Sequence, residues 1–234
     1  MELSQKLKII DLGLLYKNEI LIIGDLQLGY EDQLRNNGVM VPKFQYKDII
    51  DRLRGIFSKY KIKKIILNGD IKHEFGKINP QEWDEVLGLF DFLEKNVSEI
   101  IVIKGNHDVI LESILARKDM ELFDRYDDDY LTVVHGDKLI DNLNKVVVIA
   151  HEHPAISFSE KPSEKFKCFL VGKFKKSKLI VMPSFTEITV GSDVSRNKFL
   201  GPYLDDINKF ECILIDDKSN ARNFGKLSNV TTSI

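Results

Sequence analysis

The segment Ile100-Ile101-Val102-Ile103-Lys104-Gly105-Asn106-His107-Asp108 shows the pattern that decides the fold. Four consecutive apolar residues predict a strand buried on both faces, and a polar cluster follows where the strand ends. The carboxyl ends of strands are where open α/β sheets bind ligands, so clusters of this kind are expected to converge in space. The same pattern recurs at Ile20–Ile23 before Gly24-Asp25, Ile65–Leu67 before Asn68-Gly69-Asp70, Leu131–Val134 before His135-Gly136-Asp137, and Val146–Ile149 before Ala150-His151-Glu152-His153.

Amphipathic segments separate these strands and predict an α/β architecture with helices covering sheet faces. Residues Lys43 to Tyr60 and Asn79 to Asn96 both carry apolar residues at helical spacing, and Pro80 suits a first helical position. After His153 the runs Phe166–Val171, Leu179–Met182 and Phe210–Ile215 lack long intervening helices, which predicts a second sheet packed against the first. We expect a single domain over residues 1–218 and a flexible tail over 219–234.

Composition sets limits on the class of protein. The 234 residues carry a net charge of -2, which gives no overall attraction to nucleic acid or to an anionic membrane. No apolar run is long enough to cross a bilayer, and the first ten residues lack a signal-peptide core. Two cysteines, Cys168 and Cys212, are too few for a disulfide framework. We therefore expect a cytoplasmic protein with no membrane partner; the sequence carries no signal for an oligomeric state.

All five histidines lie in the polar clusters that follow predicted strands or the turns after them. A single histidine in such a place is commonly a surface or hydrogen-bonded residue, but five together indicate a metal site. Imidazole combined with carboxylate and amide oxygen suits zinc, manganese or iron better than calcium, and the clusters contain no cysteine for a structural zinc site. A carboxylate shared by two cations, for which Asp70 is the natural candidate, is found in many phosphatases and nucleases.

The clusters, in order and spacing, resemble the calcineurin-like metallophosphoesterases from about residue 19 to 155. The segments that carry the resemblance are Asp25-Leu26-Gln27, Gly69-Asp70-Ile71-Lys72-His73, Gly105-Asn106-His107-Asp108, His135-Gly136 and Ala150-His151-Glu152-His153. A narrower likeness to the archaeal and DNA ligase-associated branch lies in Asp25–Glu31, Pro42–Tyr46, Lys167–Gly172 and Val181-Met182-Pro183. The resemblance implies a sandwich of two mixed β-sheets flanked by helices. It also implies hydrolysis of a phosphate ester, and the expected substrate is a phosphodiester in a nucleotide or nucleic acid.

The resemblance also implies roles for individual residues. One divalent metal would bind Asp25, Gln27, Asp70 and His153, and a second would bind Asp70, Asn106, His135 and His151. His107 would face the substrate, where it would stabilise the phosphoryl transition state or protonate the leaving group, while a metal-bridging hydroxide attacks phosphorus in line. Manganese is the preferred ion, with zinc, iron and magnesium as alternatives.

Gln27 departs from the family pattern, which has histidine at this position. Its side-chain oxygen could bind a hard cation, or it could hold a metal-bound water, or the first metal could be weak or missing. The last outcome would suit a different class, a catalytically silent scaffold such as the retromer subunit of this fold. Retention of His107, His151 and His153 favours an enzyme.

Three further residues are candidates for substrate contact because they lie near the motifs. Arg35 and Lys72 are expected to contact a phosphate. His73 is expected either to contact the substrate or to orient a metal ligand, and a plain surface role is the alternative. Glu152 lies between two histidines, but on a strand-to-loop turn its side chain is expected to point away from theirs, so we expect it to have a structural role or to support a metal ligand.

Overall fold

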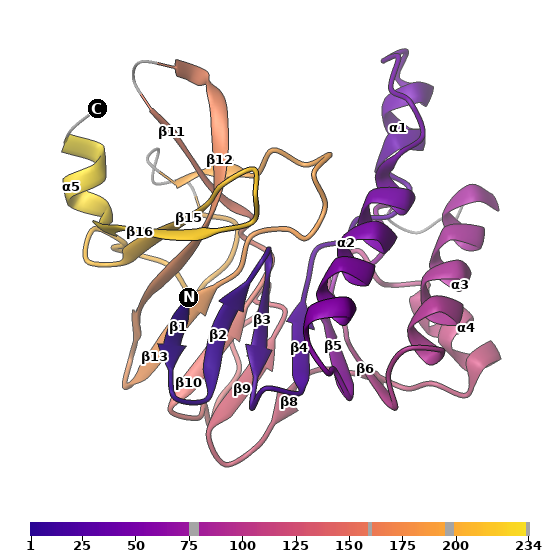
Figure 1. Cartoon of the computed structure of the whole chain (residues 1–234), viewed down its shortest axis with the longest axis horizontal. Helices are drawn as coiled ribbons and strands as arrows, with labels where there is room; N and C mark the ends of the chain where they lie inside the picture. The colour runs from indigo at the N-terminus through magenta and orange to yellow at the C-terminus, as the bar shows by residue number, and fades with distance from the viewer. Residues whose placement is uncertain (75–79, 159–160, 195–198, 233–234) are drawn as a thin grey trace.

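Two packed mixed β-sheets form the centre of the protein, with helices on the outer face of the first sheet (Figure 1). The computed structural model describes residues 1–74, 80–158, 161–194 and 199–232. The predicted sandwich of two mixed sheets in a single domain is confirmed.

The first sheet has the strand order β1-β2-β3-β4-β5-β6-β7. Strands β1 to β4 are antiparallel neighbours, whereas β4 to β7 run parallel, so the sheet is mixed. The carboxyl ends of β4, β5 and β6 therefore meet at one edge. The bounds are β1 Glu2–Ser4, β2 Leu7–Ile10, β3 Gly13–Tyr16, β4 Ile20–Ile23, β5 Lys64–Asn68, β6 Glu99–Ile103 and β7 Leu122–Phe123.

The second sheet has the strand order β14-β11-β12-β13-β10-β9-β8, with β15 paired to β12 and β16 paired to β15. Strands β9, β10 and β13 run parallel, which brings the ends of β9 and β10 to the same edge. The bounds are β8 Tyr126–Asp127, β9 Leu131–Val134, β10 Val146–Ile149, β11 Pro154–Phe158, β12 Lys161–Phe174, β13 Ser177–Val181, β14 Ser192–Asp193, β15 Glu211–Ile215 and β16 Ala221–Lys226.

The strand β10 illustrates why continuous apolar runs form these sheets. Val146 and Val148 join the core between the two sheets, while Val147 and Ile149 join a second core on the outer face. Because side chains alternate along a strand, a strand covered on both faces needs apolar residues at every position. The four apolar residues of β10 therefore contribute to both cores.

Helices α2 and α3 pack on the outer face of the first sheet and bury one apolar side each (Figure 1). Helix α3 begins at Pro80 as predicted, and Asn79 lies outside the described residues. Its Glu82 side chain accepts hydrogen bonds from the backbone N–H groups of His73 and Glu74, which ties the helix to the chain before it. The helices are α1 Tyr30–Asn36, α2 Gln45–Lys59, α3 Pro80–Glu94, α4 Leu111–Leu115, a 3₁₀ turn Ala116–Lys118 and α5 Leu227–Thr232.

From Ala221 to Thr232 the chain forms a strand and a short helix, in the segment for which the sequence predicted a flexible tail. Residues Ala221–Lys226 form β16 and pair with β15, and α5 follows at Leu227. Leu227 is buried in the outer core of the second sheet, so the segment covers an apolar face. The sequence pattern missed this strand because four of its six residues are polar or glycine and most of its side chains are exposed.

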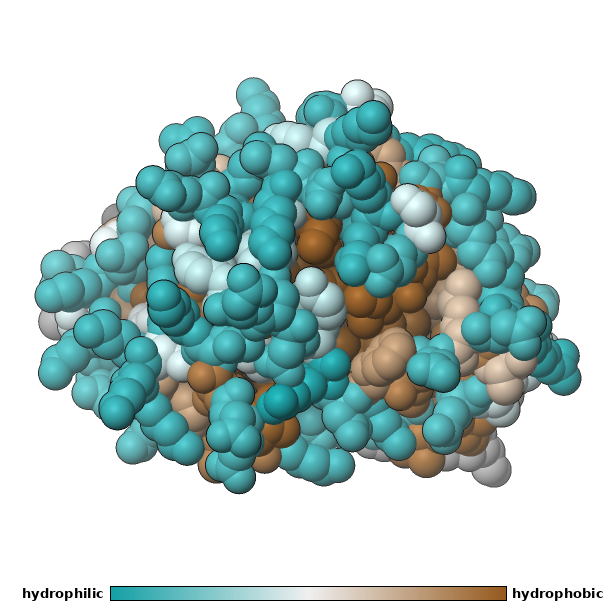
Figure 2. Space-filling view, turned by 90° about the horizontal axis from the view of Figure 1, so that it is seen from below, coloured by the Kyte–Doolittle hydropathy of each residue, from teal (hydrophilic) through white to brown (hydrophobic). Residues whose placement is uncertain are grey.

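One face of the molecule, seen from below, is mostly hydrophilic, with a band of hydrophobic residues between hydrophilic regions (Figure 2). Within the described ranges, every helix is either too short or too polar to cross a membrane.

The Asp128 carboxylate joins the two sheets. It accepts hydrogen bonds from the Tyr16 hydroxyl at 2.8 Å and the Lys17 ammonium at 2.7 Å, next to β3 of the first sheet. Its other oxygen accepts from the backbone N–H groups of Tyr130 and Leu131, at the start of β9. Burial would raise the pKa of Asp128, but the hydrogen bonds from Lys17, the backbone and Tyr16 lower it to about 2.

We predict that Asp128→Asn destabilises the protein by about 1–2 kcal/mol at pH 7, since charge-assisted hydrogen bonds contribute this order of free energy. The native-state pKa lies below the unfolded value of about 3.9, so the stabilisation is present above pH 4 and is lost as the pH falls toward 2. Urea unfolding at pH 7 and pH 3 measures this difference. Asp129→Asn, one residue away and exposed, is the control; equal stability of the two variants would contradict the prediction.

Candidate metal centre

Five turns, each after a parallel strand, bring the predicted metal ligands together at one edge of the sandwich. Ligand atoms of Asp70, His135 and His151 all lie within 4.8 Å of one another, and so do those of Asp25, Asp70 and His153. Asp70 belongs to both groups. The Asp70 carboxylate thus lies between the two groups of side chains.

The backbone at this edge is strained. A positive φ is uncommon outside glycine, and it is found at Asp25 (54°), Gln27 (50°), Asp70 (50°), His151 (64°) and His153 (45°). Each such residue costs of order 1–3 kcal/mol and persists only where the surrounding structure imposes it. Strain at five candidate ligands indicates that the turns are shaped for a site rather than for stability.

Two glycines make room for the side chains of Asp70 and His135. A Cβ on Gly105 would lie 2.2 Å from the Asp70 Oδ1 atom, and a Cβ on Gly69 would lie 2.3 Å from the His135 Nδ1 atom. Gly69 also has a φ of +77°, which other residues rarely adopt. The glycines next to Asp70 and Asn106 in the motifs are therefore steric requirements of the site.

Asp108 fixes the turn that carries Asp70, a role that was not predicted from the sequence. Its Oδ2 atom accepts hydrogen bonds from the N–H groups of Asp70 (2.7 Å) and Gly105 (2.9 Å), and its Oδ1 atom accepts from Ile71 (3.1 Å). The side chain is fully buried. Burial, and then the negative charge of Asp70, raise the pKa of Asp108 to about 6. The only sequence feature that could have indicated this role is the position of Asp108 at the end of the Gly-Asn-His-Asp motif.

Asp25 has the environment expected of a cation ligand. Its Oδ2 atom accepts a hydrogen bond from the His151 backbone N–H at 3.0 Å. Its buried Oδ1 atom accepts no hydrogen bond from the described residues, although ring nitrogens of His153 and His135 lie 3.3 and 3.9 Å away. Leaving a buried carboxylate oxygen unsatisfied is costly, and a cation at this place would satisfy it. The residues present therefore fit a metal ion.

His135 is held by the electrostatics of the same site. Its Nδ1 atom lies 3.1 Å from the Asn68 carbonyl oxygen, and its Nε2 atom lies 3.1 Å from Asn106 Oδ1 and 3.4 Å from Asp70 Oδ1. Burial alone would lower the pKa of His135, but the hydrogen bond and charge of Asp70, helped by Asp25, raise it to about 10. Two buried carboxylates require a positive charge, which either a protonated imidazole or a cation supplies.

The Gln27 side chain lies between Asp70 and His73. Its Nε2 atom donates a long hydrogen bond of 3.4 Å to Asp70 Oδ2, and its Oε1 atom lies 2.9 Å from His73 Nδ1. Burial, then the charge of His107, lower the pKa of His73 to about 4, so this imidazole is neutral at pH 7. The Gln27 oxygen would have to exchange this contact in order to bind a metal.

His107 lies at the solvent side of the shared carboxylate. Its backbone N–H donates to Asp70 Oδ1 at 3.0 Å, and its ring Nε2 lies 3.8 Å from Asp70 Oδ2. The other ring nitrogen contacts the His73 carbonyl oxygen, and the two rings stack with centroids 5.6 Å apart. The His107 side chain is 16% exposed, compared with 1% for His135. It is therefore accessible to a substrate.

The two basic residues expected to contact phosphate are placed differently. Lys72 is fully buried and its ammonium contacts the Glu74 carbonyl oxygen, so the expectation of a substrate contact is corrected. Arg35 forms an ion pair with Asp32 and donates to the Gln81 side chain at 3.1 Å. A phosphate at Arg35 would have to compete with that ion pair.

Two buried polar side chains support the turns from behind. Gln45 donates to the carbonyl oxygens of Leu26 (3.0 Å) and Gln27 (2.9 Å), which fixes the first turn. Glu152 accepts hydrogen bonds from the N–H groups of Leu200 (2.8 Å) and Gly201 (2.7 Å), which ties the loop at Leu200 to the turn between His151 and His153.

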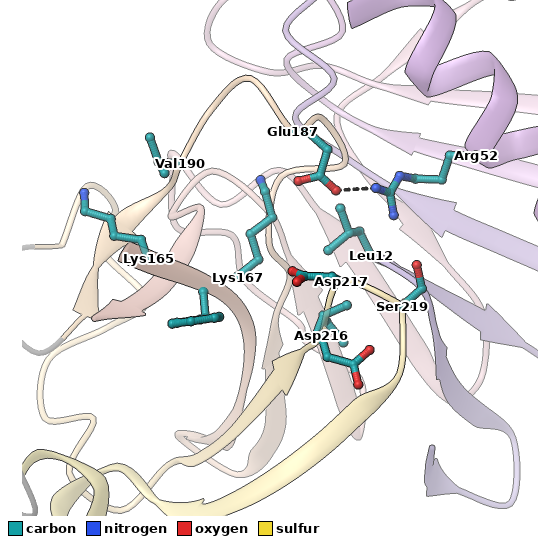
Figure 3. Close-up of a pocket in the computed structure, with 11 residues that line it drawn as sticks. Leu12, Arg52, Lys165, Lys167, Glu187, Val190, Asp216, Asp217 and Ser219 are labelled. Atoms are coloured by element: carbon teal, nitrogen blue, oxygen red, sulfur yellow. Dashed lines mark hydrogen bonds and ion pairs between the residues drawn. The ribbon is translucent and has the colours of Figure 1, made fainter. Parts of the chain in front are cut away.

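A separate hollow of about 120 Å³ contains a buried lysine (Figure 3). The Lys167 ammonium donates to the Ser184 carbonyl oxygen at 3.0 Å, and the next residue, Phe185, donates its N–H to the Gly24 carbonyl beside Asp25. Burial lowers the pKa of Lys167 to about 8. In the same hollow Arg52 is joined to Glu187. The charged side chains of Lys167 and Arg52 already have partners within the protein. Through Ser184 and Phe185, Lys167 supports the turn that carries Asp25.

Comparisons with known proteins agree with this geometry. The family profile of the calcineurin-like phosphoesterases matches residues 19–188. Among solved structures, the nuclease MPE of Pseudomonas putida matches with a TM-score of 0.68 at 16% identity, covering 93% of this chain and 94% of that chain. No curated protein matches the sequence.

Two further solved structures match more distantly. Vps29 of Chaetomium thermophilum has a TM-score of 0.38 at 12% identity, over 87% of this chain and 92% of that chain. The phosphoesterase YfcE of E. coli has a TM-score of 0.42 at 11% identity, over 88% of this chain and 98% of that chain. Because the profile match spans every turn of the candidate metal centre, the chain belongs to the calcineurin-like phosphoesterases.

Proposed function

We propose that this protein is a phosphodiesterase that uses two divalent cations to hydrolyse a phosphate ester of a nucleotide or nucleic acid. Family membership gives the general activity of a metal-dependent phosphoesterase. The proposal of two cations depends on one observation. Asp70 lies within 4.8 Å of the ligand atoms of His135 and His151, and also of those of Asp25 and His153. The likeness in fold to a nuclease supports a nucleic-acid or nucleotide substrate.

The proposed ligand sets follow from the two groups. Asp25, Asp70 and His153 would hold one cation, and Gln27 would join them only after giving up its contact with His73. Asp70, His135 and His151 would hold the other cation, with the Asn106 oxygen beside His135. Mixed oxygen and imidazole ligands without thiolate suit manganese, which we propose as the ion. When bound, such cations neutralise charge on phosphoryl oxygens and lower the pKa of water.

His107 would act on the substrate directly. Its side chain is 16% exposed, and one ring nitrogen is held by the His73 carbonyl oxygen, which orients the other toward the Asp70 side. From this place the imidazole would donate a hydrogen bond to a phosphoryl oxygen or a proton to the leaving oxygen. Proton transfer of this kind typically accelerates a reaction about 10²–10⁴-fold.

We also propose a cytoplasmic location. Cys168 and Cys212 are both free thiols buried in the second sheet, as expected for a protein of a reducing compartment.

We predict that Asp70→Ala removes both metal binding and activity, because this carboxylate belongs to both groups of ligands. Elemental analysis after loading with Mn²⁺ should find close to two ions per wild-type chain and fewer than one in the variant. Hydrolysis of bis-p-nitrophenyl phosphate should fall at least about 10³-fold. Full metal content together with unchanged activity in the variant would refute the dinuclear site. A metal-free, inactive wild-type chain would instead favour the scaffold function.

We predict that His107→Gln lowers kcat about 10²–10⁴-fold while the Mn²⁺ content stays unchanged, because this ring acts on the substrate and is not placed as a ligand. The measurement combines steady-state kinetics with elemental analysis of the same preparation. Glu112→Gln, an exposed substitution on α4 after the same motif, is the control. Loss of metal in the His107 variant would show that this imidazole is a ligand after all.

A further inference from the structure

A pocket of about 450 Å³ adjoins the candidate metal centre. Asn106 and His135, which both belong to the centre, form part of its wall. The volume lies within the range of about 300–1,000 Å³ that is usual for small-molecule sites. A phosphate held at the centre therefore has room beside it for a group that is attached to the phosphorus.

The wall away from the metal ligands is apolar. Val109 and Leu139 line the pocket and are 58% and 52% exposed, and Val134 and Ile140 line it as well. Exposed aliphatic side chains that gather around a hollow commonly mark a binding site.

The pocket also carries charges of both signs. Lys104 and Lys138 line it together with Asp124 and Asp137. Lys138 lies 3.8 Å from the Asp137 carboxylate, and its side chain is 86% exposed, so it can turn toward a ligand. The combination suits a ligand with a flat apolar face and polar edges. A sugar phosphate alone would leave the aliphatic wall uncovered, and an alkyl ester would offer no polar edge to the charged residues.

Hydrogen bonds from the opposite side hold this wall in place. The backbone N–H of Ile140 donates to the hydroxyl of buried Tyr203 at 3.2 Å. The segment before Tyr203 is tied to Glu152, and a Cβ on Gly201 would lie 2.6 Å from the Gly136 carbonyl oxygen. Two loops thus pack closely beside the pocket, which gives it a preformed shape. Preformed sites bind with less loss of conformational entropy.

We infer that this pocket binds the nucleoside that is attached to the scissile phosphate, and that Val109 and Leu139 determine this preference by packing against the base. The inference rests on the proposed function and names the substrate class of that site. A base supplies the flat apolar face, its polar edge can pair with the lysines and aspartates, and its phosphate reaches the side formed by Asn106 and His135.

The test uses two substrates with the same leaving group, the p-nitrophenyl ester of thymidylate and ethyl p-nitrophenyl phosphate, with the Mn²⁺-loaded full chain. Wild type should prefer the thymidylate ester at least about tenfold in kcat/KM. The double variant Val109→Ser/Leu139→Ser should lose about tenfold on that ester, mainly through KM, and should hydrolyse the ethyl ester as wild type does. Val190→Ser, at a position that is 57% exposed in another part of the surface, is the matched control and should match wild type on both.

Calorimetry of thymidylate binding tests the nucleoside pocket separately from the proposed phosphodiesterase activity. The double variant should bind thymidylate about tenfold more weakly than wild type or Val190→Ser. If wild type hydrolyses neither ester but this difference in binding is found, the pocket stands and the proposed activity fails. If wild type hydrolyses both esters equally well, or the double variant matches wild type in kinetics and binding, the assignment of the pocket is overturned while the activity remains.

Discussion

Two buried carboxylates close to the same imidazoles are the constraint on which the rest of the site depends. Asp25 and Asp70 are both buried, and each lies within 3.9 Å of a ring nitrogen of His135. Such charges are stable away from water only when positive charge balances them. Two buried carboxylates that need positive charge form a favourable site for a cation. The turns around Asp70 hold its carboxylate close to both groups of candidate ligands.

The sheets provide the rigidity that these strained turns need. Strands β4, β9 and β10 are buried at every position, and each passes directly into a turn that carries a candidate ligand. Asp108 then binds the backbone N–H of Asp70, and Gln45 binds the carbonyl of Gln27, so two turns with positive φ are fixed by buried side chains. The two hydrophobic cores thus stabilise the fold. They offset the cost of the positive φ angles in the turns that position the candidate ligands.

The sequence predicted the parts of the protein that depend on local pattern. Apolar runs gave the bounds of β4 and β10, and the order of polar clusters indicated which side chains meet. Features that depend on tertiary contacts were not predictable. Lys72 was expected to contact a phosphate because it lies near the motifs, but it is buried. The orientation of Gln27 depends on His73, which follows another strand. The polar strand β16 has no apolar period of its own and forms only because β15 offers an edge.

Crystals of the protein grown with Mn²⁺ and measured at the manganese absorption edge would test the central claim most directly. The anomalous map should show two peaks about 3.5–4 Å apart on either side of the Asp70 carboxylate, one beside Asp25 and His153 and the other beside His135 and His151. A map without a peak at Asp70, or with peaks only at other carboxylates, would contradict the dinuclear site and the activity built on it.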